Sequence, residues 1–261
     1  MENLTNINVI KDIFERHGFS FSKTLGQNFL INPSICPKIA EMGNAAEGWG
    51  VLEIGTGVGV LTHELAKRAD KVVAVEIDER LIPILKETLE EHDNVTVINE
   101  DVMKADLAAI IEGYYRHLPI ESITVMVQKE AGKRLCAEMG SRDTGAVTAA
   151  VRYYAEPKLL FNVSRGSFMP APNVDSCVIR LDVNKKPAVE VSDEAFYFKI
   201  VRGAFSQRRK NLCNSLSSAM GIPKGTVTEA VKAAGVSENA RPEQLQLKEL
   251  AAVAEELKKI V

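Results

Sequence analysis

Short apolar runs alternate with amphipathic stretches along the first two thirds of this chain, and each run is bounded by polar or glycine-containing turns. The short apolar runs predict buried strands, and the stretches with apolar residues every three or four positions predict helices. The expected strand–helix pairs are 49–55 with 60–69, 71–77 with 79–92, 94–101 with 106–113, and 122–128 running into a helix. A helix and a strand then share 145–164, and a last strand covers 176–183. This alternation predicts an α/β fold with a doubly wound, mostly parallel sheet.

The two ends of the chain have a different pattern. Ile7, Ile10 and Phe14 give residues 6–17 helical spacing, and a loop and second helix follow within 22–43. Beyond residue 184 the pattern is wholly helical, with its longest stretch at 193–216. We therefore predict two domains, 1–184 with the sheet and 185–261 as a small all-α domain.

The bulk composition is that of an ordinary globular protein, with 46% hydrophobic and 26% charged residues. No apolar stretch approaches the roughly 20 residues that span a bilayer, and the N-terminus lacks the apolar core of a signal peptide. We expect a cytoplasmic monomer with no membrane partner. The four histidines (His17, His63, His92, His117) show no metal-ligand spacing, so we expect no metal site.

Charge is distributed unevenly between the two predicted domains. From residue 184 onward 13 Lys/Arg face 9 Asp/Glu, a net charge of +4, and the preceding part carries −7. A basic C-terminal domain joined to an acidic N-terminal domain favours a polyanionic binding partner.

A glycine-rich turn, EIGTGVG at 53–59, follows the first strand of the sheet and predicts a nucleotide site. Its Gly55, Gly57 and Gly59 differ from the dinucleotide fingerprint G-x-G-x-x-G, whose third glycine is replaced by Val60. Glu76 ends the second strand, 21 residues after Gly55, and suits a ribose diol. These features fit a dinucleotide and S-adenosylmethionine (SAM) alike.

Asp101 favours SAM. It follows the third strand at the carboxyl edge of the sheet, where ligands of open α/β folds collect, and its carboxylate can accept a hydrogen bond from an adenine amine. Acids after three successive strands, Glu53, Glu76 and Asp101, are typical of SAM binders, because a sulfonium cation tolerates an acidic rim. Alternatively, Asp101 is a solvated residue that caps the next helix.

Seven motifs together resemble the KsgA/RsmA/Dim1 family of small-subunit rRNA adenine dimethyltransferases, which have a Rossmann-like class I methyltransferase domain. The motifs are LGQNFL (25–30), EIGTGVG (53–59), VAVEID (73–78), NEDV (99–102), VQKE (127–130), FMPAPNVDS (168–176) and AFSQRRKNL (204–212). The resemblance implies that SAM methylates N6 of two adjacent adenosines near the 3′ end of small-subunit (16S) rRNA. It also implies cofactor contacts by Asn28, Leu30, Gly55, Glu76 and Asp101. Gln27 is a further candidate in the same loop, which could also be a plain turn before a helix.

One family feature is missing. Members of the family carry an Asn-Leu-Pro-Tyr/Phe motif on the fourth strand, whereas this chain passes from the helix at 106–113 straight to the strand at 122–128. A strand and a helix, on the order of 20–25 residues, are absent near 113–117. Either residues 123–128 take the place of the missing strand or the sequence omits part of the protein. Tyr114 and Tyr115 are candidates for the tail of that motif, with Tyr114 near the chemistry.

Two further groups of residues are candidates for RNA contact. Phe168, before the rigid Pro-Ala-Pro turn, resembles the family's stacking platform for an extruded adenine, although it could equally fill the core. In the helix expected at 193–216, Phe198, Val201, Phe205 and Leu212 form a buried stripe. The basic residues largely off that stripe are Lys199, Arg202, Arg208, Arg209 and Lys210. We expect them to contact phosphates of the immature 30S subunit.

Three alternatives remain. A sister enzyme methylates adenine of large-subunit rRNA. An RNA-binding assembly factor with impaired catalysis would follow if the missing segment is a real deletion. A dehydrogenase would follow from the glycine-rich turn alone.

Overall fold

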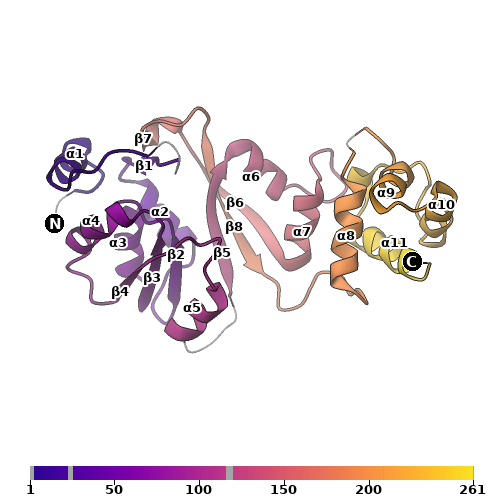
Figure 1. Ribbon diagram of the computed structural model, residues 1–261, viewed down its shortest axis with the longest axis horizontal. Coiled ribbons are helices and arrows are strands. Elements are labelled where there is room, and N and C mark those ends of the chain that lie inside the picture. The colour runs from indigo at the N-terminus through magenta and orange to yellow at the C-terminus, as the bar shows by residue number, and fades with distance from the viewer. Residues whose placement is uncertain (1–2, 23–25, 116–119, 208, 261) are drawn as a thin grey trace. The chain divides into compact units, whose positions relative to one another are not determined.

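The computed structural model describes residues 3–22, 26–115, 120–207 and 209–260. The helices and strands, which appear in Figure 1, are α1 (Ile7–Arg16), β1 (Phe29–Leu30), α2 (Ile35–Met42), β2 (Gly50–Ile54), α3 (Val60–Ala66), β3 (Lys71–Glu76), η1 (Glu79–Leu81), α4 (Ile82–Thr88), β4 (Val95–Asn99), α5 (Leu107–Tyr114), β5 (Ser122–Gln128), α6 (Lys129–Leu135), α7 (Ala146–Tyr154), β6 (Ala155–Val163), η2 (Arg165–Ser167), β7 (Phe168–Met169), β8 (Ser176–Val183), α8 (Glu194–Ala204), α9 (Leu212–Met220), α10 (Lys224–Ala233), η3 (Pro242–Gln244) and α11 (Leu247–Lys258). None of the described helices is long and apolar enough to cross a membrane.

The chain forms two compact units, each made of two stretches of sequence. One contains 1–124 and 160–178, and the other contains 125–159 and 179–261. Because both units are discontinuous, they do not test the predicted division at residue 184, which stays a prediction.

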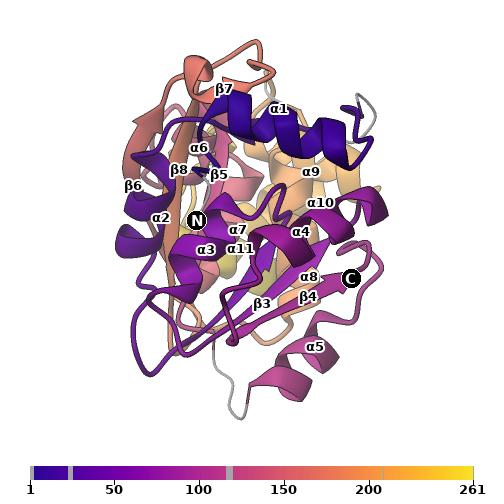
Figure 2. The ribbon, with the colours of Figure 1, turned by 90° about the vertical axis from the view of Figure 1, so that its left-hand side faces the viewer.

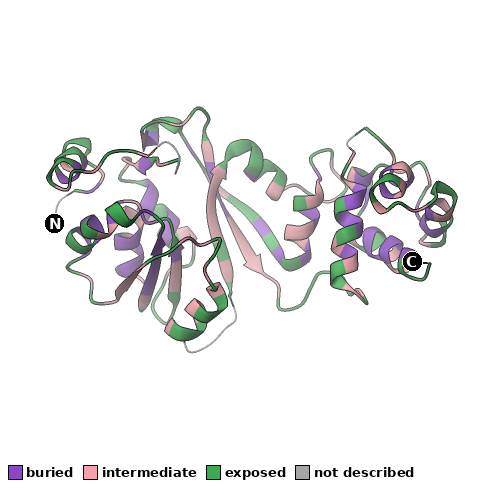
Figure 3. Ribbon diagram, viewed as in Figure 1, coloured by how far each residue is buried: buried purple, intermediate pink, exposed green. Residues whose placement is uncertain are grey.

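The first unit is built on a parallel sheet with the strand order β2-β3-β4. Parallel neighbours need helical crossovers, and Figure 2 shows α3 and α4 on one face of this sheet and α5 on the other. β3 lies in the middle and is buried over Val72–Glu76 (Figure 3). The predicted order of strands and helices is confirmed here.

The second sheet has the strand order β5-β8-β6. Among the described residues, β2 is an edge strand of the first sheet and β5 an edge strand of the second. The possibility that residues 123–128 replace the missing strand therefore stays open. No residue of β5 is buried, and Ile54 at the end of β2 is 53% exposed. In the described part of the chain, the backbone N–H and C=O groups along the free edges of β2 and β5 have no neighbouring strand, so both strands are incompletely covered.

The helical core lies in the second unit and includes α7. Ala149 and Tyr153 of α7 pack with Tyr197, Ile200 and other buried residues of α8 to α11. The predicted long helix over 193–216 is wrong: α8 ends at Ala204 and α9 begins at Leu212, capped by the Asn211 side chain, which accepts a hydrogen bond from the Asn214 N–H.

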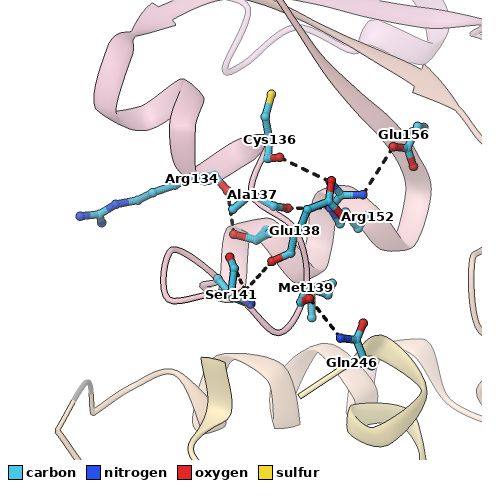
Figure 4. A network of polar contacts seen from close by, with 11 residues as sticks. Arg134, Cys136, Ala137, Glu138, Met139, Ser141, Arg152, Glu156 and Gln246 are labelled. Carbon is cyan, nitrogen blue, oxygen red and sulfur yellow. Dashed lines mark hydrogen bonds and ion pairs between the residues drawn. The ribbon is translucent and has the colours of Figure 1, made fainter. Parts of the chain in front are cut away.

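Arg152 of α7 holds the loop that leads into its own helix (Figure 4). Its guanidinium, on a side chain only 11% exposed, donates to the Ala137 carbonyl at 2.7 Å and pairs with Glu138 at 2.8 Å. Gln246, before α11, donates to the Met139 carbonyl at 3.0 Å. These contacts fix the loop to both α7 and the C-terminal helices.

Candidate cofactor and RNA site

The glycine-rich turn lies at the carboxyl end of β2 and leads into α3. Gly57 and Gly59 have φ of +57° and +87°, which disfavour side chains. A Cβ would lie 3.2 Å from the Phe29 ring at Gly57 and 3.1 Å from Leu89 at Gly59. The turn is therefore tightly packed, and glycine is needed for conformation and for space.

Glu76 organises this turn. Its Oε2 accepts hydrogen bonds from the Thr56 hydroxyl at 3.0 Å and the Gly57 N–H at 3.1 Å, and its Oε1 accepts from the Asp78 N–H at 2.9 Å. A carboxylate offers about four lone-pair sites, so one remains for a ligand hydroxyl. The side chain that was predicted to bind a ribose thus also shapes the loop.

The LGQNFL segment is attached to the same edge of the sheet. Gln27 Nε2 donates to Asp78 Oδ2 at 2.7 Å, and Asp78 also holds the guanidinium of Arg80, which keeps the pKa of Asp78 low. Asn28 is exposed, and its amide donates to the Gly26 carbonyl. Residue 25 of the motif lies outside the described residues. Sequence reasoning missed Asp78, whose position two residues after Glu76 at the start of η1 is a helix-cap signal.

A two-residue antiparallel ladder joins this segment to the FMPAP segment. Leu30 of β1 is opposite Phe168 of β7, and Phe29 is opposite Met169. Phe168 is 7% exposed, so its ring is covered in this conformation. The stacking role stays a prediction, and the core-filling alternative stays open.

Glu53 is a buried carboxyl group with an unsatisfied atom. The residue is 6% exposed, and its Oε2 has no hydrogen-bond partner among the described residues. Desolvation raises the pKa of Glu53 to about 7. A buried carboxyl group with one unpaired oxygen beside a nucleotide-type turn fits a cationic ligand.

Asp101 follows β4 and caps a turn. Its Oδ1 accepts from the Met103 N–H at 3.0 Å, and Lys104 Nζ lies 3.5 Å from Oδ2. The neighbouring Asn99 ties this corner to β3 by donating to the Glu76 carbonyl at 2.8 Å. Asp101 is thus held near the end of the sheet that carries Glu76. The helix-cap alternative is wrong, because Asp106 caps α5 by accepting from the Ala109 N–H, and the adenine-binding role of Asp101 stays a prediction.

Tyr114 is not brought to this edge. Its ring lies 5.0 Å from Lys71 Nζ, at the first residue of β3, whereas Glu76 is the last residue of that strand. Tyr115 donates to the Val51 carbonyl and accepts from the Val73 N–H. Both tyrosines therefore belong to the amino-terminal half of the strands, and the geometry gives Tyr114 no support as a residue near the chemistry.

The basic candidates divide between a helix and a loop. Lys199 and Arg202 lie on α8, whereas Arg209 and Lys210 lie in the loop before α9, and Arg208 lies outside the described residues. The four described cations are exposed, and none has an ion-pair partner within that part of the chain. The buried stripe is partly confirmed: Val201 and Leu212 are buried, and Phe198 and Phe205 are half-buried.

Residues 18–117 and 109–259 match the model of the ribosomal RNA adenine dimethylase family. The chain belongs to this family. It is 42% identical over 286 positions to the "Ribosomal RNA small subunit methyltransferase A" of Bacillus mycoides, with 98% of each chain covered, and 40% identical over 282 positions to the protein of that name in Bacillus licheniformis, with 96% of each covered.

Two solved structures are also similar. The 23S rRNA methyltransferase ErmE matches with a TM-score of 0.64 and 28% identity, covering 88% of this chain and 99% of ErmE. A dimethyladenosine transferase from Plasmodium falciparum matches with a TM-score of 0.70 and 23% identity, covering 88% and 98%. The predicted Rossmann-like methyltransferase fold is confirmed.

The comparisons also bear on the missing segment. The alignment with the B. mycoides relative has 286 positions, whereas this chain has 261 residues, so at least 25 residues of that relative have no counterpart here. The two matches to the family model overlap at residues 109–117. The overlap supports a gap near residues 109–117, and the alignment length supports missing residues without locating them.

Proposed function

We propose that this protein methylates N6 of two adjacent adenosines near the 3′ end of small-subunit rRNA, with SAM as the methyl donor. The carrying observation is the combination of the family match with Glu53, a buried acid beside the glycine-rich turn whose Oε2 has no hydrogen-bond partner among the described residues. The 42% identity to relatives named for the small subunit favours that substrate over the large-subunit rRNA named for ErmE at 28%. A substrate of this kind places the protein in the cytoplasm with immature 30S subunits.

The residues at the carboxyl edge of the sheet hold the cofactor, whose sulfonium group supplies the methyl. Glu76 offers its remaining lone pair to the ribose, and Asp101 accepts from the adenine amine. Gln27, Asn28 and Leu30 cover the site from the LGQNFL segment. Gly55, Gly57 and Gly59 let the backbone approach closely, and Glu53 balances the positive charge of the ligand.

Catalysis depends on positioning the target amine. The lone pair of an adenine amine is delocalised into the ring, and acceptors for its N–H groups make the nitrogen more pyramidal and more nucleophilic. By resemblance to the family, the asparagine of the Asn-Leu-Pro-Tyr motif is such an acceptor, and this chain lacks that motif. The 261 residues therefore supply the cofactor and RNA sites, and methyl transfer by them is slow.

A second candidate follows from the same gap. A chain that binds SAM and 30S subunits without methylating them would act as an assembly factor. To separate the two functions, the protein is incubated with SAM and, in parallel reactions, immature 30S subunits or large-subunit rRNA. Dimethyladenosine is measured by nucleoside mass spectrometry and located by primer extension on both rRNAs. Dimethylation at two adjacent small-subunit adenosines supports the methyltransferase. Binding with no incorporation supports the assembly factor, and a modified large-subunit adenosine refutes the choice of substrate.

Reversing two loop charges is expected to weaken 30S binding. Arg209 and Lys210 are exposed cations, and the slope of log affinity against log salt falls by about one for each phosphate that a protein no longer neutralises. We expect Arg209→Glu with Lys210→Glu to reduce that slope by about two in filter-binding titrations. Lys224→Glu with Lys248→Glu is the control with the same change of charge on other helices. Equal salt slopes in the two double variants would show that the loop is not part of the RNA interface.

Replacing Glu53 is expected to change the pH dependence of stability. Its folded-state pKa of about 7 exceeds the ordinary value of 4.5, so the folded state favours the protonated acid and loses stability as pH rises from 4.5 past 7. Glu53→Gln mimics the protonated form. It should be more stable than the parent by up to about 3 kcal/mol at pH 8, with little difference at pH 5.

Thermal unfolding at both pH values, with and without SAM, checks this prediction. The variant should also gain less stability from SAM, because it has lost the negative charge. Glu100→Gln, at an exposed position on the same edge, is the control. An identical pH profile for Glu53→Gln and the parent would show that Glu53 titrates normally.

A further inference from the structure

Two histidines and a glutamate converge beside the glycine-rich turn, and none of the three is among the residues assigned to the cofactor. His63 Nδ1 lies 2.5 Å from His92 Nε2, and Glu91 Oε1 lies 3.6 Å from each of these nitrogens. The His63 and His92 side chains are only 9% and 11% exposed, whereas that of Glu91 is 50% exposed. Two nearly buried imidazoles thus aim their nitrogens at one point that a carboxylate also reaches from the solvent side.

The backbone holds these side chains from two separate elements. His63 lies in α3, where its N–H donates to the Gly59 carbonyl at 2.9 Å. His92 lies in the loop between α4 and β4, and its N–H donates to the Leu89 carbonyl at 3.0 Å. Leu89 in turn packs against Gly59, so both elements meet at the end of the glycine-rich turn.

We propose that His63, Glu91 and His92 bind one divalent transition-metal ion of the zinc type. Imidazole nitrogen and carboxylate oxygen are ligands that zinc prefers, and three protein ligands leave one position for water on the exposed side. Zinc–nitrogen bonds of about 2.0–2.1 Å at a tetrahedral angle place two nitrogens about 3.3 Å apart. The two histidine nitrogens, which are hydrogen-bonded to each other in this structure, must therefore separate by less than about 1 Å when the ion replaces the proton between them.

This proposal departs from the expectation of no metal site. His63 and His92 are 29 residues apart in sequence, so no ligand spacing reveals them. The bound ion would connect α3 to the loop before β4 and so brace the turn that precedes α3. Its role is structural, and it takes no part in the proposed methyl transfer.

The experiment uses untagged, chelator-treated full chain, titrated with ZnCl2 by calorimetry and with CoCl2 by visible absorption. We expect one ion per chain, d–d bands of a low-symmetry nitrogen and oxygen site, and no sulfur charge-transfer band. Saturating zinc should raise the Tm by about 5 °C.

His92→Gln and Glu91→Gln should each weaken binding by more than about tenfold, since even groups that only orient metal ligands are worth that much. His17→Gln, which removes a histidine paired with Glu87 elsewhere, should leave binding unchanged. Zinc binding by His63→Ala is interpreted only if the circular dichroism spectrum of this variant matches that of the parent protein. Absence of one-to-one binding, binding unaffected by His92→Gln and Glu91→Gln, or a thiolate band would each overturn the proposal.

Discussion

Inserting a strand and a helix that carry the family's Asn-Leu-Pro-Tyr/Phe motif near residues 113–117 is expected to raise the rate of methyl transfer at least about 100-fold. Removing one preorganised hydrogen-bonding group from an active site costs about 10²–10³ in rate, and the missing motif supplies such groups to the target amine. The rate is measured as dimethyladenosine formed on immature 30S subunits under single-turnover conditions.

Two controls separate chemistry from folding in this experiment. The same insert with the motif asparagine changed to alanine should restore stability without restoring the rate. A glycine–serine linker of equal length should restore neither, because it forms no strand for the open edges of β2 and β5. If the uninserted chain already matches the inserted one in rate, the acceptor of the amine lies elsewhere in the 261 residues.

Glu76→Ala is expected to weaken SAM binding by about 100-fold or more. The substitution removes the proposed ribose acceptor and also leaves the Thr56 hydroxyl and the Gly57 N–H without their partner. A hydrogen bond to a charged group contributes about 1.5–3 kcal/mol, and 1.4 kcal/mol corresponds to a factor of ten in affinity; the loosened turn also no longer holds the site in its binding conformation. Equilibrium dialysis with labelled SAM measures the change.

Glu79→Gln is the matched control for Glu76→Ala, because Glu79 is exposed three residues later. It should bind SAM like the parent. Unchanged affinity in Glu76→Ala would refute both the ribose contact and the bracing of the turn by this carboxylate.

The sheet and its glycine-rich turn were predictable because their signals are local. A buried strand, a turn that requires glycine and an acid at the next strand's end lie within residues 50–76, and parallel packing brings such ends together. The pairing of Leu30 with Phe168 spans more than a hundred residues, and no local pattern specifies it.

The break after α8 shows why a periodic pattern can mislead. Phe205 and Leu212 are seven residues apart, which fits a continuous helix, but the polar run between them ends in Asn211, a helix cap. Greater weight on that capping residue would have predicted two helices. The structure around residues 113–117 was harder to predict from the sequence, because a hydrophobic pattern carries no information about a strand that the chain lacks.

The most direct test of the cofactor assignment is a pair of calorimetric titrations of the 261-residue protein, one with SAM and one with NAD. Saturable binding of one SAM per chain, with no heat from NAD beyond dilution, is the result expected from acids placed at or just beyond the carboxyl ends of three successive strands. Saturable NAD binding, or no SAM binding by the folded protein, would contradict it.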